Sequence, residues 1–195
     1  MYENKYKNIG IARIENLENF LNLVADLDEP LELFAIGGTA MVLKNIKEST
    51  KDIDFMTSES YEKVKRMLGL AGMKEESPLK MCNIWRLGEI RIDIFYDGFV
   101  MGIRFPDDWK KISEKIKDIG KVKLYIFNWY DLIITKISRS ETRDIEDIIA
   151  IIKSQKIDFN FLKERYYSIA ETALISEYDY KFKHLEGEYA KRKTN

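Results

Sequence analysis

The stretch AIGGTAMVLKNIKESTKDIDFM, residues 35–56, decides the fold. It completes an apolar run, residues 31–36, that has the composition of a buried strand and ends at Gly37 and Gly38. Residues 39–46 then have the pattern of a short helix. Glycines at such a strand-to-helix corner let backbone amides approach a phosphate closely, because no Cβ intervenes, and the helix N-terminus favours the negative charge. The corner therefore predicts a site for a phosphate-bearing substrate.

The second half of the stretch places two aspartates in another strand-like run, residues 51–56. In a strand, Asp52 and Asp54 project from the same face. Two ionised carboxylates side by side repel each other, and their partial burial is costly, so we expect a divalent cation between them. Hard oxygen ligands suit Mg²⁺ or Mn²⁺. If the later run IRIDIF lies beside this strand, Asp93 completes a three-carboxylate cluster that can hold two metal ions about 3.5–4 Å apart.

The rest of the chain divides into a mixed part and a helical part. In the mixed part, the patterns predict helices over residues 14–29 and 58–72, a hairpin of strands over 80–87 and 89–96, and a last strand over 121–127. Residues 107–120 are ambiguous between helix and loop. In the helical part, the patterns cover 128–137, 141–154 and 158–190. We therefore predict an α/β (α+β) core, residues 1–127, with a helical C-terminal extension, residues 128–195, that either packs on the core or forms one continuous domain with it.

Composition narrows the class of protein. The chain has 195 residues, of which 45% are hydrophobic, and that is enough for one well-filled core. Its net charge of -1 argues against a broad basic surface for nucleic acid. The single cysteine, Cys82, allows no disulfide framework, and no apolar run has the length of a membrane span. We therefore expect a cytoplasmic protein without a membrane partner.

The order of the motifs resembles the nucleotidyltransferase superfamily, the DNA polymerase β-like minimal nucleotidyltransferases. Its members have a strand, a glycine pair, a short helix, an Asp-x-Asp strand and a later lone aspartate. The resemblance implies a mixed sheet flanked by helices. It also implies that Gly37 and Gly38 bind the nucleotide's phosphates, that Asp52, Asp54 and Asp93 ligate the metals, and that Asp93 activates the attacking hydroxyl.

The segment DLIITKISRSETRDIEDIIAII, residues 131–152, is similar to the C-terminal helices of AbiEii-type toxins and related uncharacterised prokaryotic nucleotidyltransferases. The shared positions are Lys136, Arg143, Asp144 and Asp147. The similarity implies that Lys136 faces the nucleotide's phosphates and that Arg143 and Asp144 belong to the nucleotide site. Taken alone, the same residues fit a solvated helix face with local ion pairs.

One position departs from the pattern. Relatives often have an Arg-x-Thr-x-Asp motif before the first aspartate, whereas this chain has Glu48 at the arginine position and keeps Thr50. Neighbouring Lys47 and Lys51 offer charge but no bidentate guanidinium. We expect the hydroxyls of Thr50 and Thr39 to contribute to nucleotide binding.

Together these features predict metal-dependent transfer of an NMP group from an NTP to an acceptor hydroxyl on tRNA, a protein or a small molecule. Mg²⁺ or Mn²⁺ is the expected cofactor, in a two-metal site. The AbiEii similarity implies a toxin–antitoxin or phage-defence setting with a cognate partner. The alternative is a non-catalytic module that keeps the fold to bind a nucleotide or a partner, and Glu48 favours it. The two hypotheses differ in whether the three carboxylates converge beside the glycine pair.

Overall fold

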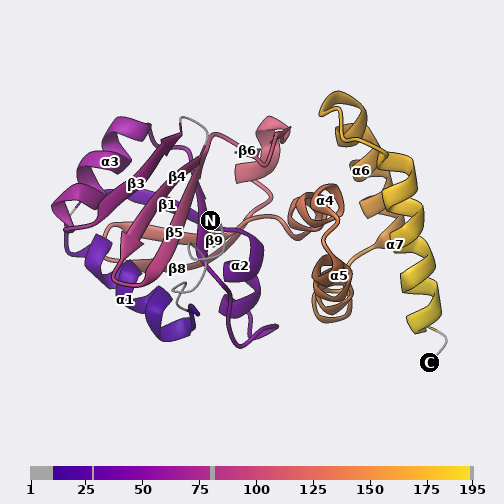
Figure 1. Cartoon of the computed structure of the whole chain (residues 1–195), viewed down its shortest axis with the longest axis horizontal. Helices are drawn as coiled ribbons and strands as arrows, with labels where there is room; N and C mark the ends of the chain where they lie inside the picture. Colours follow the sequence, from indigo (N-terminus) through magenta and orange to yellow (C-terminus); the bar gives the residue numbers. More distant parts are fainter. Residues whose placement is uncertain (1–10, 28, 80–81, 194–195) are drawn as a thin grey trace, which may run out of the picture.

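The fold is a mixed sheet with helices on its faces, followed by four helices at the C-terminal end (Figure 1). The computed structural model describes residues 11–27, 29–79 and 82–193. The strand order is β3-β4-β5-β2-β1-β9-β8, and β6 pairs with β5 and β7. β2 is parallel to β5 and β1 is parallel to β9, while the other pairs are antiparallel. The predicted fold class is therefore confirmed.

The elements occupy the following residues. The strands are β1 (Leu31–Ala35), β2 (Ile53–Thr57), β3 (Lys74–Leu79), β4 (Cys82–Leu87), β5 (Ile90–Tyr96), β6 (Phe99–Val100), β7 (Ile103–Arg104), β8 (Glu114–Ile119) and β9 (Val122–Ile126). The helices are α1 (Ile14–Ala25), α2 (Gly37–Leu43), α3 (Tyr61–Leu70), the 3-10 helix η1 (Asp107–Lys110), α4 (Trp129–Arg139), α5 (Thr142–Gln155), α6 (Phe159–Thr172) and α7 (Tyr178–Lys193).

One face of the central strands is buried under α1 and α3. Phe20 of α1 stacks on Phe55 of β2, with ring centroids 5.5 Å apart. Tyr61 of α3 meets Tyr96 of β5 edge-on at 6.4 Å. Side chains alternate between the two faces of a strand, so the residues between these buried ones project from the opposite face. On β2 and β5 those residues include Asp54 and Asp93, which the register pairs directly.

Several predicted boundaries shift in the structure. α2 begins at Gly37 and ends at Leu43, earlier at both ends than the predicted 39–46. Asp52 lies just before β2 rather than within it. β3 was not predicted, since KEESPL is charged and contains a proline, and the predicted start of the next strand at residues 80–81 lies outside the described residues.

The ambiguous segment 107–120 resolves into two elements. η1 covers its start, and β8 covers residues 114–119. β8 forms one edge of the sheet and pairs only with β9 among the described strands. Its side chains are exposed or half-buried, so this edge strand needs few apolar residues. Its sequence therefore shows no clear alternation of apolar and polar residues.

The C-terminal helices pack on the sheet domain, with α4 and α5 lying between the sheet and α6–α7 (Figure 1). The apolar side chains of α4 belong to the same buried cluster as the sheet. Arg165 of α6 donates to both oxygens of the buried Asp131, at 2.5 and 2.8 Å, and its Nη2 lies 3.4 Å from Asp108 of η1. The predicted division after residue 127 falls next to Asn128, the N-cap of α4, and remains a prediction.

Among the described residues, no helix is long and apolar enough to span a membrane.

Candidate active site

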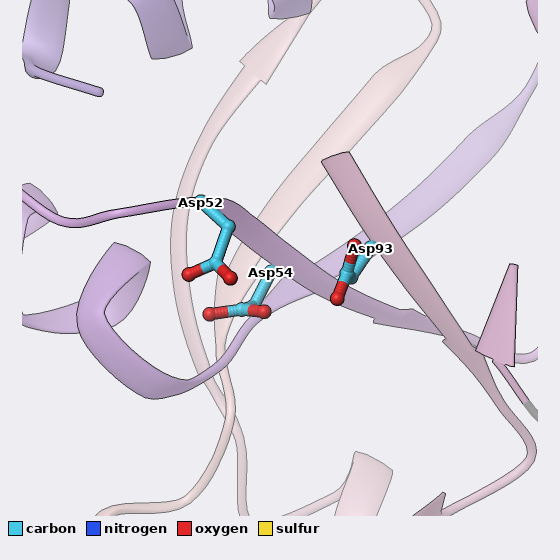
Figure 2. Close-up of side chains that lie close together, drawn as sticks. All are labelled: Asp52, Asp54 and Asp93. Carbon is cyan, nitrogen blue, oxygen red and sulfur yellow. The ribbon is translucent and has the colours of Figure 1, made fainter. Parts of the chain in front are cut away.

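Three carboxylates converge on the face of the central strands that lies opposite α1 and α3 (Figure 2). Asp52 and Asp54 come from the segment that enters β2 and from β2 itself, and Asp93 comes from the adjacent β5. One oxygen of each carboxylate lies within 4.8 Å of one oxygen of each of the others. We call these residues the acidic triad. The convergence is the geometry that sequence analysis predicted, and it arises because two parallel strands align the two in-register aspartates.

The triad carries unbalanced negative charge. Burial raises the pKa of Asp54 well above its usual range, and repulsion from Asp52 and Asp93 raises it further. Burial also raises the pKa of Asp93, although the hydrogen-bonded Arg91 guanidinium opposes that shift. Both shifts mean that the site favours protons or another cation. A group of hard oxygen donors in this state is suited to Mg²⁺ or Mn²⁺.

The glycine corner lies directly against the triad. Gly37 has a φ of +55°, and a Cβ placed on it would lie 2.8 Å from Asp54 Oδ2. A Cβ on Gly38 would lie 2.1 Å from Thr50 Oγ1. Both positions therefore exclude larger side chains. The helix α2 begins here after Ile36, which offers no side-chain cap, so its first amides are not satisfied by a capping side chain.

The two predicted threonines hold the backbone around the triad. Thr39 is 1% exposed, and its Oγ1 accepts a hydrogen bond of 2.8 Å from the backbone N–H of Asp54. Thr50 exchanges two backbone hydrogen bonds with Ala12, at 2.8 and 2.9 Å, and its side chain lies over Gly38. The structure thus places both threonines beside the site, and their contact with a nucleotide stays a prediction.

Lys136 lies in a buried ion cluster rather than on an open surface. Its Nζ is 2.6 Å from Asp147 Oδ2 and 3.6 Å from Asp144 Oδ1, and its side chain is 4% exposed. The other oxygen of Asp147 is 2.6 Å from the Nζ of Lys47, which follows α2. This cluster therefore ties the segment after α2 to α4 and α5. In this arrangement Lys136 of α4 forms ion pairs with carboxylates of α5.

Arg139 completes the ion cluster on the side of the triad. Its guanidinium donates to both oxygens of Asp144, at 3.0 and 2.5 Å. Burial acts to raise the pKa of Asp144, but this ion pair and the N–H of Glu141 outweigh burial and lower the pKa. Asp144 is thus an ionised anchor for Arg139. The positive charge of Arg139 also acts to lower the pKa of Asp54, so Arg139 interacts electrostatically with the acidic triad.

Arg143 is exposed and lines an open cavity. The cavity has a volume of about 460 Å³ and lies between the segment before β2 and the turn from α4 to α5; its lining is Lys51, Ser140, Glu141, Thr142 and Arg143. Arg143 pairs with Glu141 at 3.2 Å. One lining residue, Lys51, directly precedes the first aspartate of the triad in the sequence. Of the residues predicted for the nucleotide site from the C-terminal helices, Arg143 is the one at an open position.

Two arginines near the triad were not among the predicted site residues. The spacing of Arg139 to Asp144 fits an ordinary local ion pair, so the sequence alone does not distinguish Arg139 from a residue on a solvated helix face. Arg91 alternates with apolar residues on β5, and this pattern is typical of a solvent-facing strand residue. Its position two residues before the lone aspartate was the available signal, since such residues share one strand face.

Comparison with known proteins adds the following. A family model described as "Nucleotidyltransferase of unknown function (DUF6036)" matches residues 12–195. A search of the curated proteins finds no match.

Solved structures resemble the chain in fold at low sequence identity. The crystal structure of ANT(2″)-Ia in complex with adenylyl-2″-tobramycin superposes with a TM-score of 0.59 at 13% identity, over 80% of this chain and 97% of that one. The solution structure of the antibiotic-resistance factor ANT(2″)-Ia gives a TM-score of 0.63 at 14% identity, over 87% and 98%. JHP933 from Helicobacter pylori gives 0.52 at 13% identity, over 93% and 94%.

Proposed function

Since the chain belongs to the family described as nucleotidyltransferase of unknown function (DUF6036), we propose that it transfers an NMP group from an NTP to an acceptor hydroxyl, with release of pyrophosphate. The observation that carries this proposal is the convergence of Asp52, Asp54 and Asp93 beside Gly37 and Gly38. A phosphate-bearing substrate and a cation can meet there, because glycines allow close approach to backbone amides and the triad attracts positive charge.

The acidic triad fits a divalent metal. Three carboxylate oxygens from different residues lie within 4.8 Å of one another. Burial, and then repulsion from Asp52 and Asp93, raises the pKa of Asp54, so a cation that binds there would stabilise its ionised form. Asp52, Asp54 and Asp93 would hold Mg²⁺ or Mn²⁺ in a two-metal site. When bound, the metal neutralises the triphosphate and lowers the pKa of the acceptor hydroxyl. Asp93 accepts the proton of that hydroxyl at a carboxylate oxygen.

The chain's other residues orient the nucleotide. The amides at Gly37 and Gly38 point from the start of α2, where a phosphate oxygen can accept from them. Lys51 and Arg143 supply positive charge in the neighbouring cavity, and Arg139 faces the triad from the end of α4. Much of the rate enhancement of phosphoryl transfer comes from such positioning and electrostatic stabilisation.

The acceptor is a hydroxyl on a small molecule, a protein or a tRNA. The adenylyl-2″-tobramycin in the ANT(2″)-Ia complex supports a small-molecule acceptor. The net charge of -1 argues against a large nucleic-acid footprint. The similarity to AbiEii-type toxins supports a cytoplasmic toxin–antitoxin or phage-defence role with a cognate partner.

A second candidate function is a non-catalytic module that binds nucleotide. Two observations favour it. Glu48 is exposed at the position where relatives have a guanidinium, and Lys136 is committed to buried carboxylates rather than to an open site. Such a module would bind an NTP without transferring it.

Labelling separates the two functions. The purified protein is incubated with each of four α-³²P-labelled NTPs, with Mg²⁺ or Mn²⁺, and with tRNA, cell lysate or a panel of small hydroxylated molecules. Asp54→Asn removes one triad charge, and Asp118→Asn on the exposed edge strand β8 is the matched control. Transfer that is lost with Asp54→Asn and kept with Asp118→Asn supports the enzyme. NTP binding without transfer to any acceptor supports the binding module.

A further inference from the structure

Arg91 holds the third carboxylate of the triad in a fixed orientation. Its Nε lies 2.7 Å from Asp93 Oδ1 and its Nη2 lies 2.6 Å from Asp93 Oδ2. The two residues are two apart on β5 and therefore share a face. The side chain of Asp93 is 8% exposed and that of Arg91 is 31% exposed. A bidentate pair of this kind fixes the plane of the carboxylate as well as its position.

The neighbouring strand explains why Arg91 is available to the triad. Arg86 of β4 lies directly opposite Arg91 in the sheet register, so the two guanidinium groups would repel each other if neither had a partner. Arg86 is instead bonded to Glu76 of β3, with its Nε 2.6 Å from Oε1. Each of the two adjacent arginines thus has its own carboxylate partner, Glu76 for Arg86 and Asp93 for Arg91.

We propose that Arg91 is a positioning residue for metal binding: it orients Asp93 and offsets one of the three negative charges of the triad. This inference deepens the proposed function and rests on it. A carboxylate oxygen has two lone pairs, so an oxygen that accepts from Arg91 retains one for a metal ion. The positive charge of Arg91 weakens the attraction for that ion, whereas its hydrogen bonds keep the ligand in place. The charge of Arg91 therefore lowers the affinity for the metal ion, whereas the fixed orientation of Asp93 supports turnover.

Two substitutions separate charge from orientation. Arg91→Gln removes the charge and the bidentate pair, while Arg91→Lys keeps the charge and loses the planar fork. Full-length protein without nucleotide is titrated with Mn²⁺ at about pH 8, and free Mn²⁺ is followed by electron paramagnetic resonance. We expect Arg91→Gln to bind Mn²⁺ roughly tenfold more tightly, from Coulomb's law for a single and a double charge about 6 Å apart in a water-like dielectric. Arg91→Lys should bind like the wild type.

Turnover should fall in both variants, unlike Mn²⁺ affinity, which should rise or stay unchanged. Both variants should transfer NMP more slowly than the wild type, because Asp93 loses its fixed orientation. Arg86→Gln is the matched control, since it removes the same charge from the opposite position on the same face but leaves the pair of Arg91 and Asp93 intact. We expect it to change Mn²⁺ affinity less than about threefold.

The outcomes are distinguishable. If the wild type binds Mn²⁺ and Arg91→Gln changes the affinity no more than Arg86→Gln does, the role of Arg91 is overturned and the metal site stands. If the wild type binds no Mn²⁺, the proposed metal site is overturned and this inference with it. If Arg91→Gln does not fold, Arg91→Lys decides: wild-type affinity with reduced turnover supports the role, and wild-type turnover overturns it.

Discussion

Replacing Asp54 by asparagine is expected to stabilise the metal-free protein while it abolishes transfer. Oxygens of the three triad carboxylates lie within 4.8 Å of one another. Two unit charges at that distance repel by about 0.9 kcal/mol in a water-like dielectric and by about 3.5 kcal/mol at an effective dielectric of about 20. Attractions to Arg91 and Arg139 offset part of this repulsion. We therefore expect the free energy of unfolding to rise by about 1–2 kcal/mol with Asp54→Asn.

The pH dependence gives the sign of the effect. Burial, then repulsion from Asp52 and Asp93, raises the pKa of Asp54 well above its value in the unfolded chain. The folded protein therefore favours the protonated group. Its contribution to stability is fully present below the unfolded pKa and is lost as the pH rises through the folded pKa. Asparagine cannot ionise, so the advantage of the variant should be greatest near pH 8 and should shrink as the pH falls.

Urea unfolding in EDTA at a series of pH values measures the difference, with the midpoint shifted upward by about 0.5 M for a chain of this size. Added Mg²⁺ should reverse the order, because an ion that binds the folded triad stabilises the wild type more than the variant. Asp118→Asn on β8 controls for the loss of a carboxylate elsewhere. An Asp54→Asn variant that is less stable than the wild type in EDTA at pH 8 would refute the account of unbalanced charge.

Further substitutions test the surroundings of the triad. Thr39→Val should cost about 1–3 kcal/mol in urea unfolding and slow transfer, because it leaves a buried β2 amide without its acceptor, whereas Thr39→Ser should cost less; equal costs would contradict this role. Gly38→Ala should lower the melting temperature and NTP binding together, since its Cβ would lie 2.1 Å from Thr50 Oγ1; unchanged nucleotide affinity, measured by calorimetry, would show that the corner tolerates a side chain. Lys136→Met should destabilise the protein by about 3–5 kcal/mol, because it leaves buried carboxylates with one fewer partner. Exposed Lys153→Met is its control and should have almost no effect, so similar unfolding curves for the two variants would contradict the importance of the buried cluster.

The acidic triad could be predicted from the sequence because it depends on strand periodicity. Residues two apart share a face, and an aspartate in an otherwise apolar strand has few structural explanations. Asp54 and Asp93 therefore follow from local patterns, once their strands are placed side by side. The glycine corner follows for the same reason, since Gly37 and Gly38 separate a strand from a helix in a way that few other residues allow.

The partners of charged residues could not be predicted in this way. The sequence does not distinguish a solvated ion pair from a buried one, because burial depends on how helices pack. Lys136 was expected to face a nucleotide, and the structure encloses it between α4 and α5. The pairing of Arg86 with Glu76 could not be predicted either, because the charged, proline-containing sequence of β3 does not indicate a strand. Such contacts are decided by tertiary structure.

The link between Lys47 and Asp147 restricts how this gene can change over evolutionary time. Lys47 lies on the segment that leads to Asp52, and its ion-pair partner lies on α5, a hundred residues later in the chain. A deletion that removes α5, or an exchange of the C-terminal helices with those of a distant relative, would leave this anchor of the segment without its carboxylate. Selection on the triad therefore also acts on the C-terminal helices. We expect the two parts of the chain to be inherited together rather than recombined as independent modules.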